Sequence, residues 1–361
     1  MKLVFLCKRR PMGRDLFTRP YGRFFYIPHL LSQYGHEVYL LLLNYQHEPT
    51  VEIKKNGINW SSVSLLPKGP LTYIRQIKQL VEKINPDWII GFSDTYFGIL
   101  AQKLGSKYNI PSLIDAYDNY ESYIPWLKPL HHLWRDSVSK ATLVTAAGPN
   151  LAALLGQQRL NKPTVVVPMA ADPIFSPIDK QDARNSLGLP LDKLLIGYCG
   201  SISAIRGIDI LFDVYAELKQ EFSNLGLVLS GRKENKIKLP RNIHWLGYLS
   251  DEKVVSVLNS VNVLTVINRV SKFGSYSYPV KLYEAMSCQV PVVATETPAT
   301  RWILGDYPDL LVKADDPEAL YQAIKNTLTS SCISYTPQTW EQSAAIFNDL
   351  LVNYNELDKS T

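Results

Sequence analysis

The segment 194–207 combines a strand pattern with residue types that suit an anionic ligand. Residues 194–198 form an apolar run, and Gly200, Ser201 and Arg206 follow in the next loop. Glycine lets the backbone approach a ligand closely, a following helix offers unpaired N–H groups to an anion, and arginine binds phosphate in bidentate geometry. The G-x-G-x-x-G spacing of dinucleotide-binding folds is absent, which argues against a nicotinamide enzyme. A plain loop with a solvated arginine explains the segment equally well.

The segment 277–286 places a lysine and a glutamate on one face of an expected helix. Pro279 suits the first helical position, and the free amides of that turn suit a diphosphate or a sugar hydroxyl. Lys281 and Glu284 are three residues apart, so they share a helix face. The glutamate could accept two hydrogen bonds from a ribose diol. The alternative is an exposed Lys–Glu pair, which is common at helix starts.

The loop that follows the first expected strand is strongly basic. Its cations are Lys8, Arg9, Arg10, Arg14, Arg19 and Arg23, and only Asp15 opposes them within the loop. Like charges on one loop repel each other, which favours a phosphorylated or otherwise anionic ligand. We therefore expect Arg9, Arg10, Arg14 and Arg19 to bind the acceptor or a phosphate. A solvated basic loop is the alternative.

Two further segments in the N-terminal half carry polar and aromatic side chains. Residues 115–121 follow an expected strand and contain three carboxylates, Asp118 among them, and two tyrosines. They could bind sugar hydroxyls, and a polar loop without a function explains them equally well. Residues 123–135 mix aromatic and basic side chains, which suits a lipid headgroup surface. A packed loop and helix is the commoner explanation of such a stretch.

Short apolar strands alternate with amphipathic helices along both halves of the chain, which predicts parallel sheets covered on both faces. The expected strands are 2–7, 37–43, 60–65, 87–91, 112–114, 142–145, 194–198, 226–229, 243–245, 263–267 and 291–294. The expected helices are 24–34, 72–84, 208–222, 251–260, 281–287 and 317–328, and helical patterns also precede the strands 112–114 and 142–145. The fold class is therefore α/β, with two Rossmann-like doubly wound domains whose strand ends face a central cleft. This architecture alone would also suit an epimerase, a binding protein or a dehydrogenase pair.

The size and composition of the chain fit this organisation. The 361 residues are enough for two domains, which we expect at 1–172 and 173–337, with a C-terminal helix in 338–361 that crosses back to the first domain. The hydrophobic fraction is 46% and the charged fraction 20%, near the averages of globular proteins. The net charge of +5 is compatible with anionic small molecules or anionic lipid surfaces. No nucleic acid partner is expected.

The cysteines and the lengths of the apolar runs indicate the cellular compartment of the protein. The four cysteines form no CxxC pair and have no histidine cluster near them, so neither a zinc site nor a disulfide framework is indicated. The apolar run at the N-terminus is too short for a signal peptide, and no run approaches the roughly 18 residues of a membrane span. We expect a cytoplasmic protein.

Taken in order, the segments resemble the retaining GT-B glycosyltransferases of glycosyltransferase family 4 over nearly the whole chain. Residues 34–38 are similar to the family's Gly-His-Glu-Val turn, and residues 166–172 are similar to its Pro-Asn-Gly-Val-Asp junction. The most specific likeness is Pro-Val-Lys-Leu-Tyr-Glu-Ala-Met at 279–286, followed by Pro-Val-Val-Ala-Thr at 291–295. The resemblance implies that a hexose-like unit moves, with retention, from a nucleoside diphosphate donor to a saccharide or lipid-linked saccharide acceptor. It implies a role in polysaccharide or glycoconjugate biosynthesis, donor binding in domain 173–337 and acceptor binding in domain 1–172.

The resemblance also implies roles for individual residues. Arg206 falls where the family has a lysine that contacts the donor phosphates, Glu284 falls on a glutamate that binds the ribose, and Asp118 falls near a histidine beside the donor sugar. We therefore expect Arg206, Lys281 and Asp118 to be catalytic. The expected donor-binding residues are Gly200, Ser201, Arg206, Arg232, Tyr276, Tyr278, Pro279, Val280 and Glu284. The resemblance implies no enzyme nucleophile. It also implies no metal or other cofactor, because positive side chains would neutralise the diphosphate.

The sequence departs from the family pattern at several positions, among them Met169-Ala170 in place of Asn-Gly, and Thr18 and Arg19 in place of paired glycines. Ser201 stands where most members have a phosphate-binding arginine, Tyr276 stands at the first glutamate of the motif, and Gln289 replaces a glycine after the helix. These departures leave open a catalytically inactive GT-B subunit that stabilises a partner glycosyltransferase. A sugar-nucleotide epimerase ranks last, because the Pro-x-Lys-x-x-Glu likeness does not fit that class.

Overall fold

The computed structural model describes residues 1–361 except 68, 161, 270–275, 277, 330–332 and 360–361. The chain divides into two compact units, each described here by itself. Unit 1 comprises Met1–Met169 and Thr339–Thr361, and unit 2 comprises Ala170–Gln338. The domain boundaries expected at 172/173 and 337/338 lie within three residues of this division. Ser277, the first residue of the expected donor segment, lies outside the described residues.

Among the described residues, unit 1 has an eight-stranded sheet in the order β3-β4-β2-β1-β5-β6-β7-β8. All neighbouring strands pair in parallel except β3 and β4. The strands are β1 (Lys2–Lys8), β2 (Glu37–Asn44), β3 (Val51–Lys55), β4 (Ile58–Ser64), β5 (Trp88–Gly91), β6 (Ser112–Ala116), β7 (Leu143–Ala146) and β8 (Thr164–Val166). The sequence did not predict β3, because this edge strand is mostly exposed and therefore lacks the apolar alternation of a half-buried strand.

Helices cover both faces of the unit 1 sheet. They are α1 (Arg23–Gln33), α2 (Pro70–Ile84), α3 (Thr95–Tyr108), α4 (Lys128–Lys140), α5 (Pro149–Gly156) and α12 (Trp340–Lys359). α2 forms where the sequence predicted it, because Tyr73, Ile77, Val81 and Ile84 recur every three or four residues and are buried against the sheet together with residues of α3. On the other face of β1, Phe5 contacts the ring of Phe347 in α12.

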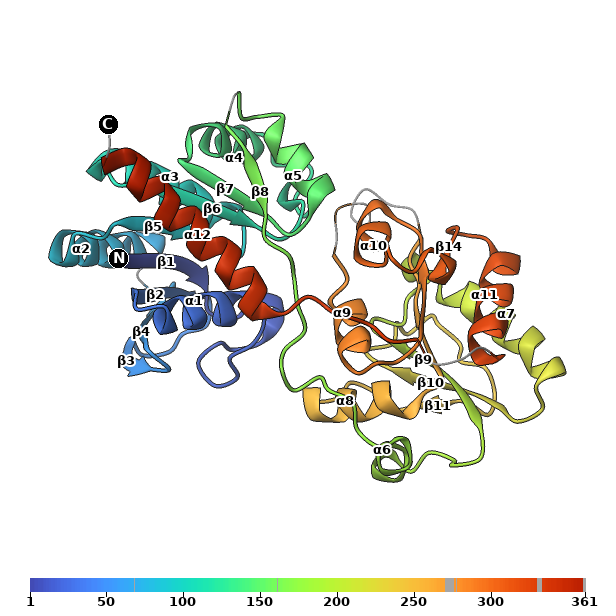
Figure 1. Cartoon of the computed structure of the whole chain (residues 1–361). Helices are drawn as coiled ribbons and strands as arrows, with labels where there is room; N and C mark the ends of the chain where they lie inside the picture. The colour runs from blue at the N-terminus through green and yellow to red at the C-terminus, as the bar shows by residue number, and fades with distance from the viewer. Residues whose placement is uncertain (68, 161, 270–275, 277, 330–332, 360–361) are drawn as a thin grey trace. The chain divides into compact units, whose positions relative to one another are not determined.

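The C-terminal helix α12 belongs to unit 1, where it packs on α1 (Figure 1). Trp340 stacks on Tyr26 of α1 with ring centroids 5.8 Å apart. The Ser343 hydroxyl donates a hydrogen bond to the Pro168 carbonyl oxygen at 3.0 Å. The last residues of the chain therefore complete the core of the unit that the first residues begin.

Unit 2 has a six-stranded sheet among its described residues, in the order β11-β10-β9-β12-β13-β14, with all pairs parallel. The strands are β9 (Leu194–Cys199), β10 (Leu225–Ser230), β11 (His244–Trp245), β12 (Val263–Val266), β13 (Val292–Thr295) and β14 (Leu311–Val312). The helices are α6 (Lys180–Leu187), α7 (Ile208–Glu221), α8 (Asp251–Ser260), α9 (Val280–Ser287), α10 (Pro298–Ile303) and α11 (Pro317–Thr329). The α/β fold class with two doubly wound, Rossmann-like sheets is confirmed.

Some short elements were not predicted, and one helix start is corrected. β8, β14, α5, α6 and α10 were absent from the predicted elements, and most of them are too short for a clear periodic pattern. Pro279 was expected as the first helical residue, but it is the N-cap of α9 and has an extended backbone with φ −69° and ψ 109°. The first free amides of the helix therefore belong to Val280 and the residues after it.

Candidate functional site

The carboxyl end of β9 lies at the switch point of the unit 2 sheet. β9 has β10 on one side and β12 on the other, so the chain leaves β9 for one neighbour and later crosses to the other. Open parallel sheets bind ligands in the crevice that such a switch creates. Gly200 and Ser201 follow β9 directly, which puts the first expected donor-binding residues at this crevice.

Two glycines hold the loop after β9 close to the loop after β10. The Gly200 N–H donates a hydrogen bond to the Ser230 carbonyl oxygen at 2.9 Å. Gly231 has φ +136°, and a Cβ atom there would lie 1.8 Å from the Gly200 carbonyl oxygen. Only glycine fits at this position. The exposed residue Ser201 is also anchored, because its carbonyl oxygen accepts a hydrogen bond from the Tyr198 hydroxyl at 2.8 Å.

Hydrogen bonds link Arg206 to Asn268, which follows β12, and through Asn268 to Thr295 at the end of β13. Arg206 ends the short 3₁₀ helix Ala204–Arg206, and its Nη1 donates a hydrogen bond to Asn268 Oδ1 at 2.6 Å. The Asn268 N–H in turn donates to Thr295 Oγ1 at 3.1 Å. Because Asn268 is neutral, this contact orients the guanidinium without neutralising its charge. The sequence did not single out Asn268; the available signal was a polar residue just after the expected strand 263–267.

Lys281 and Glu284 form a partly buried ion pair in α9. The Glu284 side chain is only 6% exposed and that of Lys281 is 28% exposed, so the alternative of an exposed surface pair does not hold. Burial raises the pKa of the Cys199 thiol to about 12, while the charge of Lys281 lowers this pKa and that of Glu284 raises it. α9 packs on β12 and β13, and the charges of its Lys281 and Glu284 act on the thiol of Cys199, the last residue of β9.

The other expected donor-binding residues of unit 2 have contacts of their own. Tyr278 is buried and packs edge-on against Trp302 with ring centroids 5.7 Å apart. The Arg232 carbonyl oxygen accepts a hydrogen bond from the Ile202 N–H at 2.9 Å. The Arg232 guanidinium lies 5.0 Å from the ring centre of Tyr248. Tyr276 is partly buried.

Arg269, which the sequence did not single out, links the 3₁₀ helix Ala204–Arg206 to the segments around it through a hydrogen bond and two ion pairs. Its guanidinium pairs with Asp209 at 2.5 Å and with Asp315 at 2.9 Å. Its Nε donates to the Ala204 carbonyl oxygen at 3.1 Å. These ion pairs are largely exposed and contribute little stability individually. Their effect is to hold the start of α7 and the 3₁₀ helix in one position.

The basic loop of unit 1 differs from the expectation of mutually repelling charges. Arg9 pairs with Asp15 at 2.9 Å and with Glu48 at 2.6 Å, and Arg10 pairs with Asp15 at 2.6 Å and with Glu48 at 2.7 Å. The expectation counted only Asp15, because Glu48 follows β2 and is distant in the sequence. Burial alone would raise the pKa of Asp15, but its hydrogen bond from Arg9 and the charges of both arginines lower this pKa below the usual value.

The other cations of this loop also have specific environments. The Arg14 guanidinium lies 4.9 Å from the ring centre of Tyr21. The backbone N–H of Arg19 donates to the Asp15 carbonyl oxygen at 2.8 Å. Arg23 is not a loop residue at all: it begins α1 and forms a fully buried ion pair with Asp115, whose shortest N–O distance is 2.5 Å. This pair is part of the core.

Asp118 lies at the carboxyl edge of the unit 1 sheet, just after β6. It is buried, and its Oδ2 accepts a hydrogen bond from the Tyr123 hydroxyl at 2.9 Å. Burial and the neighbouring charges of Tyr117 and Asp118 raise the pKa of Tyr123 well above its usual value. Asp118 is thus held in place by Tyr123. It belongs to unit 1, whereas the donor-binding candidates belong to unit 2.

No group of three or more histidine, cysteine, aspartate or glutamate side chains in the described part of the chain is arranged to hold a metal ion. No described helix combines the length and apolar character that crossing a membrane requires.

Comparisons with known proteins identify two family models that match the chain. The model "Glycosyl transferases group 1" matches residues 193–330. The model "Family 4 Glycosyltransferase in conflict systems" matches residues 28–257. A D-inositol 3-phosphate glycosyltransferase of Stackebrandtia nassauensis is 26% identical over 210 residues, which cover 52% of this chain and 46% of the relative. The chain therefore matches about half the length of that relative.

Solved structures of similar fold cover nearly the whole chain. The sucrose-phosphate synthase of Thermosynechococcus elongatus has a TM-score of 0.71 at 16% identity, over 99% of this chain and 98% of that protein. Anabaena HepE in complex with UDP-glucose has a TM-score of 0.65 at 15% identity, over 99% and 98% of the two chains. At such identities the likeness concerns the fold, which is GT-B.

Proposed function

Since the chain belongs to the family 4 glycosyltransferases, we propose that it transfers a hexose-type sugar from a nucleoside diphosphate donor to a hydroxyl group of a saccharide or lipid-linked saccharide. The observation that carries this proposal is the buried Lys281–Glu284 pair in α9, in the same unit as the Gly200–Arg206 loop at the switch point of the sheet. The likeness to HepE, solved with UDP-glucose, supports uridine diphosphate as the first nucleotide to test.

In this proposal Glu284 binds the donor ribose. An ionised carboxylate has two oxygens with about four acceptor sites, so the contact with Lys281 leaves acceptor capacity for a ribose diol. The free amides of α9 begin at Val280, and Tyr278 and Pro279 form the turn before them. Helix N-termini stabilise anions such as a diphosphate.

Arg206 and Lys281 would stabilise the negative charge that develops on the leaving nucleoside diphosphate. Arg206 is oriented for this by Asn268. The backbone of Arg232 is hydrogen-bonded to Ile202, the neighbour of Ser201, and Arg232 would offset the arginine that Ser201 replaces. We propose retention without an enzyme nucleophile, and with no metal or other cofactor. Asp118 in unit 1 would contact the transferred sugar.

A catalytically inactive subunit remains the second candidate, because Ser201 and Tyr276 depart from the family pattern. The departure at Gln289 carries less weight. Its backbone has φ 56°, a conformation in which glycine is favoured, and its side chain exchanges two hydrogen bonds with the main chain of Tyr335, at 3.0 and 2.8 Å. Gln289 therefore has a structural role there that glycine could not fill.

Donor hydrolysis separates the two candidates. We expect the purified chain to release nucleoside diphosphate slowly from at least one of a panel of uridine, guanosine and adenosine diphosphate sugars, because the charges that stabilise the leaving group do not require an acceptor. The release is followed by a coupled nucleotide assay. Nucleotide binding by calorimetry without any hydrolysis or transfer would instead identify an inactive subunit.

We further propose that unit 1 contacts an anionic membrane surface, as a peripheral protein on the cytoplasmic side. The support is an exposed apolar surface around the start of α4, formed by Tyr123, Ile124, Trp126, Leu127 and Leu133. Trp126 is 76% exposed, which is unusual for tryptophan, and the exposed Lys128 lies beside it. Tryptophan with basic neighbours is typical of headgroup contacts. Arg9 and Arg10 support this proposal less than expected, since both are paired.

Replacing Trp126 with alanine should weaken binding to anionic vesicles about tenfold, the worth of partly burying one large apolar side chain. Binding should also fade at high salt, because the Debye length falls to about 3 Å at 1 M. Co-sedimentation with phosphatidylglycerol vesicles measures both effects. Leu191→Ala, which removes an exposed apolar side chain from unit 2, is the control. If the unmodified protein stays in the supernatant at low salt, the membrane proposal is wrong.

A further inference from the structure

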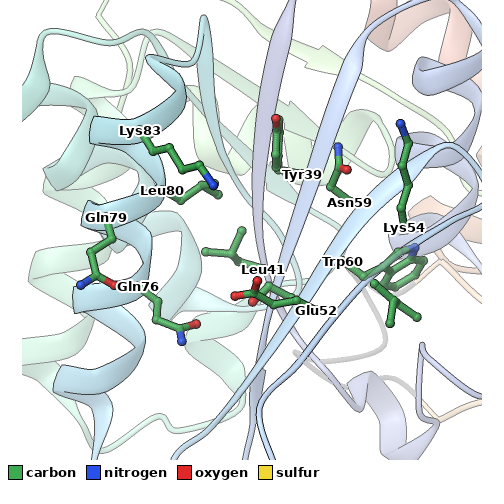
Figure 2. A pocket seen from close by; sticks show the side chains of 12 residues that line it. Tyr39, Leu41, Glu52, Lys54, Asn59, Trp60, Gln76, Gln79, Leu80 and Lys83 are labelled. Carbon is green, nitrogen blue, oxygen red and sulfur yellow. The ribbon is translucent and has the colours of Figure 1, made fainter.

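Unit 1 contains a pocket of about 410 Å³ away from the loops discussed above. Strands β2, β3 and β4 form its floor and one side, and helix α2 forms the opposite wall (Figure 2). The volume lies within the roughly 300–1,000 Å³ of small-molecule sites. The lining residues of β2 and β4 all come before the last three residues of these strands. The pocket therefore lies toward the opposite end of the strands from Arg9, Arg10 and Asp118.

The strand register places polar side chains in two neighbouring rows on the pocket floor. In one row Tyr39 is opposite Asn59, and Asn59 is opposite Lys54. In the second row Leu41 is opposite Ser61, and Ser61 is opposite Glu52. Because side chains alternate between the faces of a sheet, all six point to the same face.

The same sheet face is apolar where α2 covers it. Leu43 and Val63 lie two residues beyond Leu41 and Ser61 along their strands, and they are buried in a core cluster with Ile77 and Val81 of α2. A helix-facing sheet surface is normally apolar throughout, since its side chains lose contact with water. The change to Asn59 and Ser61 marks the place where the helix no longer fills the space above the sheet.

The wall of the pocket is a polar stripe of α2 next to its buried side. Gln76, Leu80 and Lys83 are separated by four and three residues, so they lie on one face of the helix. In Figure 2 the side chains of Gln76 and Lys83 extend from α2 toward the strands. Gln79 completes the wall. The helix thus presents amides and an ammonium group across the pocket from the hydroxyl, amide and carboxylate groups of the floor.

This combination of groups matches the surface of a neutral saccharide. Amides and hydroxyls both donate and accept hydrogen bonds, as sugar hydroxyls require, and the partly buried Leu80 and Tyr39 ring offer an apolar surface for the C–H face of a sugar ring. An apolar ligand would shield the partly buried Gln76 amide from water at a cost. Lys54 and Lys83 line the pocket as well as Glu52, so a strongly charged ligand of either sign would meet a like charge.

We infer that this pocket binds a neutral oligosaccharide, as a second site that holds an acceptor or product chain away from the place of transfer. The inference rests on the proposed function for the link to the acceptor, whereas saccharide binding itself follows from the pocket. Binding in such an open site is weak, and it would raise the local concentration of chain ends near the enzyme.

Saturation-transfer NMR with tetrasaccharides of glucose, mannose and N-acetylglucosamine tests the inference on the full chain. At least one should bind at millimolar concentration, and Gln76→Ala/Gln79→Ala should weaken this binding about tenfold, the loss of two modest hydrogen bonds. Alanine is the better helix former, so the double variant should fold. Lys78→Ala, on the same helix but outside the pocket lining, should bind as the unmodified protein does.

A second arm separates this inference from the proposed function. Glu284→Ala should leave tetrasaccharide binding unchanged while it weakens nucleotide binding, and Gln76→Ala/Gln79→Ala should do the reverse. If nucleotide binds and none of the three tetrasaccharides does, the pocket inference is wrong and the proposed function stands. Equal saccharide binding by the double variant and the unmodified protein also overturns it.

Discussion

Arg206→Ala is expected to lower turnover of the sugar donor about 100-fold, which is the usual loss when a preorganised charge that stabilises a transition state is removed. Arg206 is oriented at the switch point by its hydrogen bond to Asn268, where it would stabilise the leaving diphosphate. The donor concentration should be saturating, because the expected loss is in kcat. Steady-state kinetics with the donor identified by the nucleotide panel measures it.

Two further variants distinguish charge from geometry at Arg206. Arg206→Lys retains the positive charge without the planar fork and should recover part of the activity. Asn268→Ala removes the hydrogen bond that orients Arg206 and should cause a smaller loss, on the order of tenfold, in kcat rather than in KM. Arg206 would not act on the β-phosphate if its alanine variant lost affinity equally for nucleoside monophosphate and nucleoside diphosphate.

The long periodic elements were predictable because local sequence determines them. The helix expected at 251–260 coincides with α8, and the helix expected at 72–84 differs from α2 by two residues at its start. Both have a repeating apolar face that packs on a sheet. β3 was missed for the opposite reason, since an exposed edge strand is stabilised mainly by its pairing with β4, which local pattern does not reveal.

The candidate site was predictable where it depends on chain position and unpredictable where it depends on long-range partners. Gly200, Arg206 and Glu284 follow from their places after a strand or in a helix. Asn268, 62 residues from Arg206 in the sequence, is recognisable only once the strand order is known. The same limitation explains Glu48, which pairs with Arg9 and Arg10 and removes the charge repulsion that the basic loop seemed to require from sequence alone.

Glu284→Ala should weaken nucleoside diphosphate binding by roughly 1.5–3 kcal/mol, the worth of hydrogen bonds to a charged group. By the affinity relation this corresponds to about 10- to 150-fold in Kd. The carboxylate is buried in α9 beside Lys281, so water cannot replace it easily as a partner of the ribose diol. Calorimetric titration with the best nucleotide of the panel gives the change directly.

The contribution of charge at Glu284 is measured with Glu284→Gln, which keeps one carbonyl acceptor in a side chain of nearly the same shape. This variant should lie between the unmodified protein and Glu284→Ala, because one neutral acceptor remains for the ribose. The control is Glu318→Ala, which removes an exposed glutamate from α11 and should leave affinity unchanged. Thermal melting of all three variants checks that they are folded. A nucleotide affinity that stays the same in Glu284→Ala would show that the ribose does not bind at this carboxylate.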